Sequence, residues 1–223
     1  MKKYGGILMD KKDYKKIYKD IYVPSMQPQL IELPPISYVC VEGKGDPNTS
    51  SSFQEAISLL YGLSYTIKMN RKIDGYFEYV VPPLEGLWWS DKNIFDGLSV
   101  KDKNDFCWKL MIRLPEFVDE DIFMKAKEEL KVKKNVKVDL LKREIIEEGL
   151  CVQIMHKGSF DEEAKSIEKI YQYIQNHGLA SDISSLRFHH EIYLSDFRRT
   201  KTENLKTVIR HPVKKQSYNL KYR

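Results

Sequence analysis

One pattern occurs twice in the chain, and this repeat constrains the fold more than any other feature of the sequence. The strand-like run 36–42 is followed by a glycine turn and by a helical pattern over 51–68. The strand-like run 150–156 is likewise followed by a glycine and by a helical pattern over 161–176. Apolar residues recur at intervals of three and four in both helical stretches, as in an amphipathic helix. The chain is therefore predicted to contain two related units.

The residues around these helices support the same interpretation. Gly45 and Gly158 occupy equivalent places, and glycine allows the positive φ that a chain needs when it turns from a strand into a helix. Two further strand patterns follow each helix, and in both units the last one ends in Ile-Arg-x-Pro, at Arg113 and Arg210. These four predicted strands cover 76–81, 105–113, 187–194 and 206–210.

The repeat predicts an α+β protein of two strand–helix–strand–strand modules, related by a pseudo-two-fold axis, whose antiparallel sheets form a central ligand cleft. A polar extension with a short helix is expected at 1–30, and the domain itself at 31–223. The first module covers about 31–118 and the second about 148–215, with a bridging helix at about 119–133.

The composition fits a globular protein and argues against several other classes. Hydrophobic residues make up 42% and charged residues 31% of the chain, the usual balance for a protein with a core. The net charge of +5 is small and dispersed, so direct nucleic-acid binding is not expected. No apolar run approaches about 18 residues, which argues against a membrane span or signal peptide. The separated cysteines Cys40, Cys107 and Cys151 indicate free thiols and a cytoplasmic location.

The segment 187–194 carries most of the functional information. Strand alternation puts Arg187, His189, Glu191 and Tyr193 on one face, and the apolar residues between them on a face that should pack beneath the helices. A carboxylate between an imidazole and a phenol could simply lie on a solvated sheet face. We favour a concave aromatic pocket in which Glu191 is the charge, and a tight pair with Arg187 is the structural alternative.

A metal site is not predicted, and no cofactor is expected. His189 and His190 are adjacent on a strand and point to opposite faces, so the pair cannot chelate one ion. No cysteine or histidine partner lies at a usual ligand spacing from them. A nucleophile elbow is absent, and Gly43-Lys44-Gly45 lacks the Gly-Lys-Ser/Thr ending of a phosphate-binding loop.

The run 81–89, Val-Pro-Pro-Leu-Glu-Gly-Leu-Trp-Trp, is expected to form a loop after the middle strand of the first module, because prolines and a glycine punctuate it. Adjacent tryptophans are costly to expose, so either Trp88 or Trp89 should be buried, in the core or against a ligand. Trp108, on the following strand, has the same two possibilities.

These motifs resemble the GyrI-like small-molecule-binding family over nearly the whole chain. The resemblance implies two pseudo-symmetric modules around a central cleft. Related effector domains of multidrug-responsive transcription regulators bind lipophilic cations with a buried glutamate. The resemblance implies that Glu191 corresponds to that glutamate. The matching stretches are Tyr14–Tyr22, Gly43–Asn48, Leu60–Lys68, Pro82–Trp89, Trp108–Pro115, Glu148–Gly158, His189–Arg199 and Lys206–Val213.

Within that family, the Pro-Leu-Glu-Gly-Leu-Trp-Trp and His-His-Glu-Ile-Tyr motifs are similar to those of cyclopropanoid cyclopropyl hydrolases. Such enzymes open the strained ring of DNA-alkylating natural products inside an aromatic cage. The resemblance makes Glu191 the catalytic candidate if the protein is an enzyme. The ligand-binding candidates are Glu191, Tyr193, His189, Trp88, Trp108, Tyr65, Phe123 and Tyr171.

Three functions remain open from the sequence. The first is the binding or sequestration of hydrophobic or aromatic xenobiotics, cationic ones included, in an aromatic pocket with a buried Glu191. The second is the hydrolysis of cyclopropane-bearing compounds, with Glu191 as the base. The third is a protein-interaction module, such as one that protects a topoisomerase. Aromatic walls and a desolvated carboxylate serve both binding and hydrolysis, so the sequence does not separate the first two.

Overall fold

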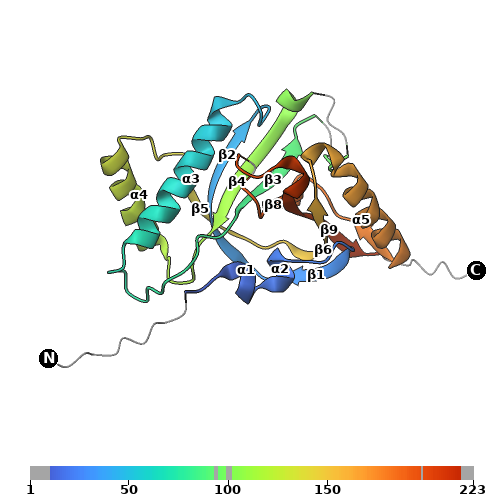
Figure 1. Ribbon diagram of the computed structural model, residues 1–223, viewed down its shortest axis with the longest axis horizontal. Coiled ribbons are helices and arrows are strands. Elements are labelled where there is room, and N and C mark those ends of the chain that lie inside the picture. Colours follow the sequence, from blue (N-terminus) through green and yellow to red (C-terminus); the bar gives the residue numbers. More distant parts are fainter. Residues whose placement is uncertain (1–10, 93–94, 99–101, 197, 217–223) are drawn as a thin grey trace, which may run out of the picture.

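One antiparallel sheet runs through the computed structural model, which describes residues 11–92, 95–98, 102–196 and 198–216 (Figure 1). Its strands are β1 (Gln29–Leu33), β2 (Ile36–Lys44), β3 (Leu84–Ser90), β4 (Phe106–Arg113), β5 (Lys142–Ile146), β6 (Gly149–Lys157), β7 (Leu179–Ser181), β8 (His189–Tyr193) and β9 (Lys206–Lys215). The helices are α1 (Tyr14–Ile17), α2 (Lys19–Tyr22), α3 (Ser51–Met69), α4 (Glu120–Lys134) and α5 (Ala164–Asn176). The predicted α+β class is confirmed.

The strand order has the same form when it is followed from either edge. It runs β1-β6-β9-β8-β3-β4-β2-β5, with β7 paired to β9. Strands β3 and β8 pair at the centre, so that the expected two modules share one sheet rather than facing each other as two. Exchanging β3 with β8, β4 with β9, β2 with β6 and β1 with β5 gives the same order followed from the other edge. This order is what a pseudo-two-fold axis requires, and the superposition of the modules stays a prediction.

The strand-to-helix turns have the local chemistry that the sequence indicates. Gly45 has a φ of 112° and Gly158 a φ of 133°, in the region that favours glycine. Helix α3 begins at Ser50, whose side chain accepts a hydrogen bond from the Phe53 N–H. Helix α4 begins at Asp119, which caps it in the same way. These caps fix where the helices begin and so how they lie on the sheet.

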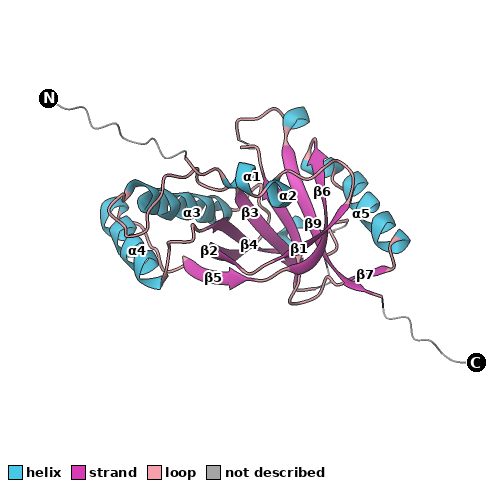
Figure 2. Ribbon diagram, turned by 90° about the horizontal axis from the view of Figure 1, so that it is seen from below, coloured by secondary structure: helices cyan, strands magenta, loops and turns pink. Residues whose placement is uncertain are grey.

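Opposite faces of the sheet are covered by different parts of the chain. Helices α3, α4 and α5 lie on one face, with α3 and α4 at one end and α5 at the other (Figures 1 and 2). Side chains such as Trp88 and Ile209 pack against them. The turns α1 and α2 lie on the opposite face, where Tyr22 packs with Leu87 and Ile192. The middle of the helical face, over β3 and β8, lies between α3 and α5.

The central strand β3 contradicts the sequence-based prediction for this region. The expected strand 76–81 is irregular, apart from a bridge between Tyr79 and Lys12, whereas the expected loop contains the seven residues of β3. The two prolines precede this strand and therefore cost it no hydrogen bond. Gly86 is needed within it, because a Cβ there would lie 2.9 Å from Trp88 Nε1. Close packing, rather than a turn, explains this glycine.

Three other expectations also differ from the structure. The apolar face of β8, including Ile192, packs under α1 and α2 and not beneath the large helices. Helix α4 packs through Phe123 and Leu130 on the cluster around α3 instead of bridging the modules. The polar N-terminal extension contributes the fully buried Tyr14 and Tyr22 to the core. Strands β1, β5 and β7 were not predicted.

The described helices include none with the length and apolarity that a membrane crossing requires.

Candidate functional site

Glu191 lies at the centre of the sheet, on the face that carries the large helices. Its side chain is 12% exposed, so it is nearly buried yet reachable. His189 Nε2 lies 2.9 Å from Glu191 Oε1, and the Tyr193 hydroxyl donates to Glu191 Oε2 at 2.7 Å. Strand alternation thus brings together the three residues that the sequence places on one face. Arg187 instead pairs with Asp182, so the alternative Arg187–Glu191 pair is not formed.

The hydrogen bonds around Glu191 extend in both directions across the sheet. Trp88 Nε1 donates to the Tyr193 hydroxyl at 3.0 Å, and His211 Nε2 lies 2.8 Å from His189 Nδ1. Burial, and then the neighbouring His189, hold the pKa of His211 well below its usual value. His211 is therefore a neutral imidazole that can share a proton with His189. Glu191 is held in one orientation by partners whose own positions are fixed.

Glu163 supplies a second carboxyl group at this site. It stands at the entry to α5 and is 6% exposed. Its ligand atom and those of His189 and Glu191 all lie within 4.8 Å of one another. Burial, and then the Glu191 carboxylate, raise the pKa of Glu163 well above its usual range, against a hydrogen bond with Thr207. These three side chains could hold a metal ion, which the sequence-based argument from ligand spacing did not anticipate.

Aromatic rings surround the carboxyl groups. The ring of Phe95 meets His189 edge-on at 5.3 Å, and the ring of Phe160 meets Tyr193 at 6.0 Å. Trp88 packs on Phe106, which in turn contacts Phe95. Such walls remove a planar ligand from water and favour positive charge over their faces.

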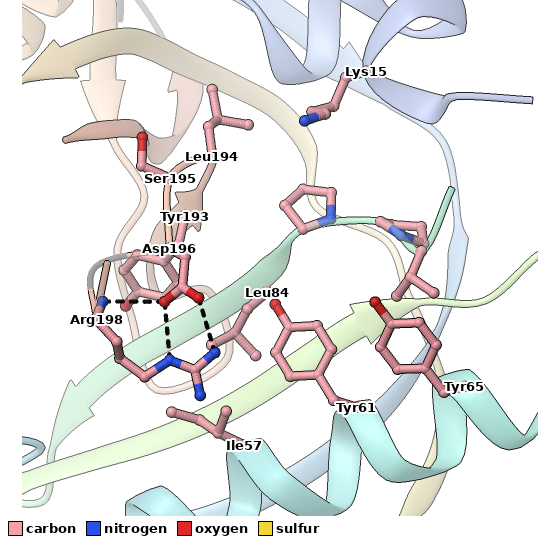
Figure 3. A pocket seen from close by; sticks show the side chains of 13 residues that line it. Lys15, Ile57, Tyr61, Tyr65, Leu84, Tyr193, Leu194, Ser195, Asp196 and Arg198 are labelled. Carbon is pink, nitrogen blue, oxygen red and sulfur yellow. Dashed lines mark hydrogen bonds and ion pairs between the residues drawn. The ribbon is translucent and has the colours of Figure 1, made fainter. Parts of the chain in front are cut away.

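Two cavities flank the hydrogen bond between Trp88 and Tyr193. The first, of about 210 Å³, is lined by Tyr65 and Tyr193, and also by Arg198, which is paired with Asp196 (Figure 3). The second, of about 530 Å³, is lined by Trp88 and by residues of the 183–185 segment. A cavity of several hundred Å³ is the size that holds a small organic ligand. Tyr193 lines the first cavity and Trp88 lines the second, whereas Glu191, His189 and Glu163 are not among the residues that line either one.

The structure brings together only some of the eight residues predicted to bind a ligand. Glu191, His189, Tyr193 and Trp88 form one hydrogen-bonded group. Tyr65 and Tyr171 lie at its margins: Tyr65 lines the smaller cavity, and Tyr171 contacts His211.

Trp108 and Phe123 lie elsewhere, in the core beneath the helices. They are 1% and 2% exposed, respectively. Trp108 packs edge-on against Phe53, and the ring covers Gly43, where a Cβ would come 2.2 Å from it. In this conformation neither ring reaches either cavity, so their role as cage residues stays a prediction.

Three residues of the site were missed from the sequence. Glu163 belongs to the run Asp161-Glu162-Glu163, which has the pattern of a solvated first helical turn. His211 lies in the second Ile-Arg-x-Pro ending, and alternation along β9 places it with Ile209 beneath α5. Phe95 lies in a polar insertion without periodicity. Of these three residues, only His211 could have been assigned to the site from the sequence, by strand alternation.

A second polar cluster lies behind the site, on the face covered by α1 and α2. His190 Nδ1 is 2.9 Å from one oxygen of Glu148, and Arg210 donates to the other at 2.7 Å. His190 Nε2 lies 3.1 Å from Glu85. Burial opposes ionisation of Glu148, but His190 and Arg210 lower its pKa to about 2. Every charge in this cluster has a fixed partner.

The same cluster attaches the N-terminal turns to the sheet. Arg210 is fully buried and donates to the Ile21 carbonyl and to the side chain of Gln153. Tyr22 donates to Glu85 at 3.3 Å. These contacts give the buried charges a structural role, which the group around Glu191 lacks.

The comparisons with known proteins agree with this geometry. A family model, the GyrI-like small molecule binding domain, matches residues 26–214. The chain belongs to the GyrI-like family.

Solved structures support the same placement for this GyrI-like protein. An uncharacterized conserved protein from Listeria innocua is 41% identical, with a TM-score of 0.86, and a hydrolase from Listeria innocua is 39% identical, with a TM-score of 0.83. Each is covered over 100% of its length by 92% of this chain. The EcmrR C-terminal domain, at 14% identity and a TM-score of 0.50, shares the fold, with 85% of this chain covering 98% of it. No curated protein matched.

The family places a small-molecule-binding domain over the residues that build the carboxyl cluster and both cavities. The GyrI-like protein is thus a small-molecule-binding protein.

Proposed function

We propose that this protein hydrolyses a hydrophobic, planar electrophile that carries a strained three-membered ring. The observation that carries the proposal is the geometry of Glu191. A reachable carboxylate is held by His189 and Tyr193, between aromatic walls, without an Arg or Lys partner among the described residues. Side chains that merely stabilise a fold rarely leave a buried carboxylate in this condition. The 39% identical relative described as a hydrolase supports the same reaction class.

The reaction needs one water molecule and a proton relay. Glu191 orients the water and takes one of its protons as the oxygen attacks a ring carbon. The strained C–C bond breaks, and its electron pair passes into the conjugated system of the ligand. A proton then neutralises that electron pair, so the product is the substrate plus one water. Glu163, whose carboxyl atom lies within 4.8 Å of that of Glu191 and whose pKa is raised, is our candidate for the donor of this proton.

The aromatic residues prepare the ligand for this step. Stacking against Trp88 and the rings near it removes apolar surface from water, at roughly 25 cal/mol per Å². The same walls exclude bulk water, which strengthens the interaction of Glu191 with the attacking molecule. His189 and Tyr193 keep the carboxylate aimed at one point, so that little reorganisation is needed during the reaction.

The test uses a spirocyclopropyl cyclohexadienone as probe, with mass spectrometry of the product. We expect a product that is heavier by one water and that forms with wild type but at least about 100-fold more slowly with Glu191→Gln, the scale of a removed general base. The matched control is Glu162→Gln, an exposed carboxylate one residue from Glu163. If Glu191→Gln turned over the probe as fast as wild type, the proposed role of Glu191 would be wrong.

Sequestration of lipophilic cations is the second candidate. It is favoured by one observation, the carboxylate of Glu191 without a basic partner, because such a group attracts a cation in a low-dielectric site. The two candidates differ in product: tight binding of a cationic dye, quenching of tryptophan fluorescence and an unchanged probe would favour sequestration. A topoisomerase-protecting interaction and the absence of nucleic-acid binding stay predictions from the sequence.

A further inference from the structure

Three side chains from separate parts of the chain converge on one point of the site. Glu163 comes from the entry to α5, whereas His189 and Glu191 come from the same face of β8. Each offers one ligand atom, and the three atoms lie within 4.8 Å of one another. His189 Nε2 and Glu191 Oε1 are already 2.9 Å apart. Two carboxylates and an imidazole at this spacing form a donor set that proteins use for metals.

We propose that Glu163, His189 and Glu191 bind one divalent first-row transition-metal ion, with Zn²⁺ as the probe ion. Imidazole nitrogen and carboxylate oxygen suit Zn²⁺ and its neighbours, whereas Mg²⁺ prefers an octahedral shell of oxygen and retains its waters. Three protein ligands leave a coordination position for water, as in open metal sites. This inference goes beyond the proposed hydrolysis and does not depend on it. The ion would bind the form of the site in which Glu163 and Glu191 are both ionised, so that with the ion bound they serve as ligands rather than as proton donor and base.

The orphaned oxygen of Glu163 is an independent observation in favour of a ligand here. Glu163 Oε1 is buried and has no hydrogen-bond partner in the described structure. A buried polar atom without a partner costs free energy, of the order of 1–3 kcal/mol. In the part of the chain that the structure describes, no salt bridge links Glu163 or Glu191 to a Lys or Arg. A cation between the two carboxyl groups would satisfy this oxygen and replace the repulsion between them.

The surroundings of the three ligands resemble the second layer of a metal site. His211 contacts the other ring nitrogen of His189, and Tyr193 donates to the other oxygen of Glu191. Such partners orient ligands and fix the histidine tautomer. His211 can accept a hydrogen bond as well as donate one, so His189 can offer a bare Nε2 to a metal.

The geometric change required is small. Zn²⁺ at about 2.1 Å from each ligand in a tetrahedral site sets ligand atoms roughly 3.4 Å apart. The pair formed by His189 and Glu191 must open by about half an ångström from this arrangement. Glu163 must approach by about 1.4 Å at most, since its ligand atom lies within 4.8 Å of the other two.

The experiment is a titration of untagged protein with Zn²⁺ by calorimetry, repeated with Co²⁺ and followed by its visible absorption. We expect one ion per chain, no saturable binding of Mg²⁺, and affinity for Zn²⁺ at least tenfold lower in Glu163→Gln and in Glu191→Gln. Glu162→Gln tests the neighbouring exposed carboxylate, and His177→Asn tests the exposed histidine. Both controls should bind as wild type does.

Folding is checked for every variant by circular dichroism, and Glu163→Gln is close in shape to the native residue. If only one of the two Glu variants folds, the folded one gives the comparison. Equal Zn²⁺ affinity in wild type and in the folded Glu variants would overturn the proposal, because the ion would then lie elsewhere. Absence of saturable Zn²⁺ binding by wild type would overturn it too. Loss of Zn²⁺ binding in His177→Asn would also overturn the proposal, because the ion would then be bound at His177.

Discussion

The two faces of β8 carry similar polar groups in different electrostatic situations. On the face of α3 and α5, Glu191 and Glu163 lie near His189, and among the described residues neither is paired with a Lys or Arg. On the opposite face, Glu85 and Glu148 lie near His190, but there the fully buried Arg210 is bonded to Glu148. Two carboxyl groups and a histidine occur on both sides, and one guanidinium distinguishes them.

This difference separates a structural cluster from the cluster to which we assign the proposed function. Breaking a buried ion pair is costly because it leaves an uncompensated charge, so the Arg210 cluster should resist substitution. His189 and Tyr193 orient the Glu191 carboxyl group, and no Lys or Arg is paired with it among the described residues. The comparison predicts that substitutions in the Arg210 cluster lower the stability of the protein, whereas substitutions in the Glu191 cluster weaken ligand binding.

The largest effect is expected for Arg210→Met. The substitution removes the partner of Glu148 and the donor to the Ile21 carbonyl, so the free energy of unfolding should fall by about 3–5 kcal/mol. Urea denaturation measures it. The control is Arg198→Met, which removes an exposed pair with Asp196 and should cost at most about 1 kcal/mol. Equal costs for the two substitutions would break the comparison.

The pH dependence of stability should reveal the same cluster. The folded pKa of Glu148 is about 2, below its ordinary value of 4.5, so its contribution is complete above pH 4.5 and is lost as the pH falls towards 2. The full loss amounts to about 3 kcal/mol, of which about 2 kcal/mol falls between pH 6 and pH 3. Denaturation of wild type and Glu148→Gln at pH 6 and pH 3 measures it. A variant that loses as much stability as wild type over this range would show that Glu148 is not the group responsible.

Glu191→Gln should change ligand binding more than stability, whereas Arg210→Met should mainly lower stability. The free energy of unfolding should change by less than about 1 kcal/mol, because packing and hydrogen-bonding capacity are largely kept. Binding of a lipophilic cationic dye should weaken by about 1–3 kcal/mol, the scale of a charge-assisted contact, and binding of a neutral dye of matched shape should change less. Fluorescence titration of both dyes measures this. Equal losses of affinity for the two dyes would mean that Glu191 does not distinguish a cationic ligand from a neutral one.

The smallest effect is expected for Tyr193→Phe, which sharpens the comparison within the functional face. It removes the donor to Glu191 Oε2 and the acceptor for Trp88 Nε1 while keeping the ring. Stability should fall by about 1 kcal/mol, and cationic dye affinity should fall by less than in Glu191→Gln. The same denaturation and titration experiments measure both. A larger loss of cationic dye affinity than in Glu191→Gln would mean that Tyr193, rather than Glu191, is the main contact of the cation.

The repeat was visible in the sequence, but its register was not. Gly45 N–H donates to the Phe106 carbonyl, and Gly158 N–H donates to the Leu205 carbonyl. Arg113 lies seven positions after Phe106, whereas Arg210 lies five after Leu205. The first arm is therefore two residues longer, and overlaying Arg113 on Arg210 should bring Gly43, rather than Gly45, near Gly158. Only pairing across strands decides this, because both glycines fit a turn equally well.

The sequence alone determined the features that depend on local geometry. Alternation along β8 placed His189, Glu191 and Tyr193 on one face, because successive side chains of a strand point to opposite sides. Capping and periodicity located α3, α4 and α5 to within a few residues. The family resemblance then identified Glu191 as the residue of interest, and the structure shows it as a nearly buried carboxylate.

The tertiary structure alone decided what lies next to those residues. Glu163 reads as a solvated first-turn residue in the sequence, and only the packing of α5 on the sheet brings it to Glu191. The helices cover the polar face of β8 rather than its apolar one, because α1 and α2 bury Ile192 from the other side. Burial and pairing are non-local, since they depend on segments far apart in the chain. For that reason two adjacent histidines of one strand belong to different clusters, His190 to the one held by Arg210 and His189 to the one around Glu191.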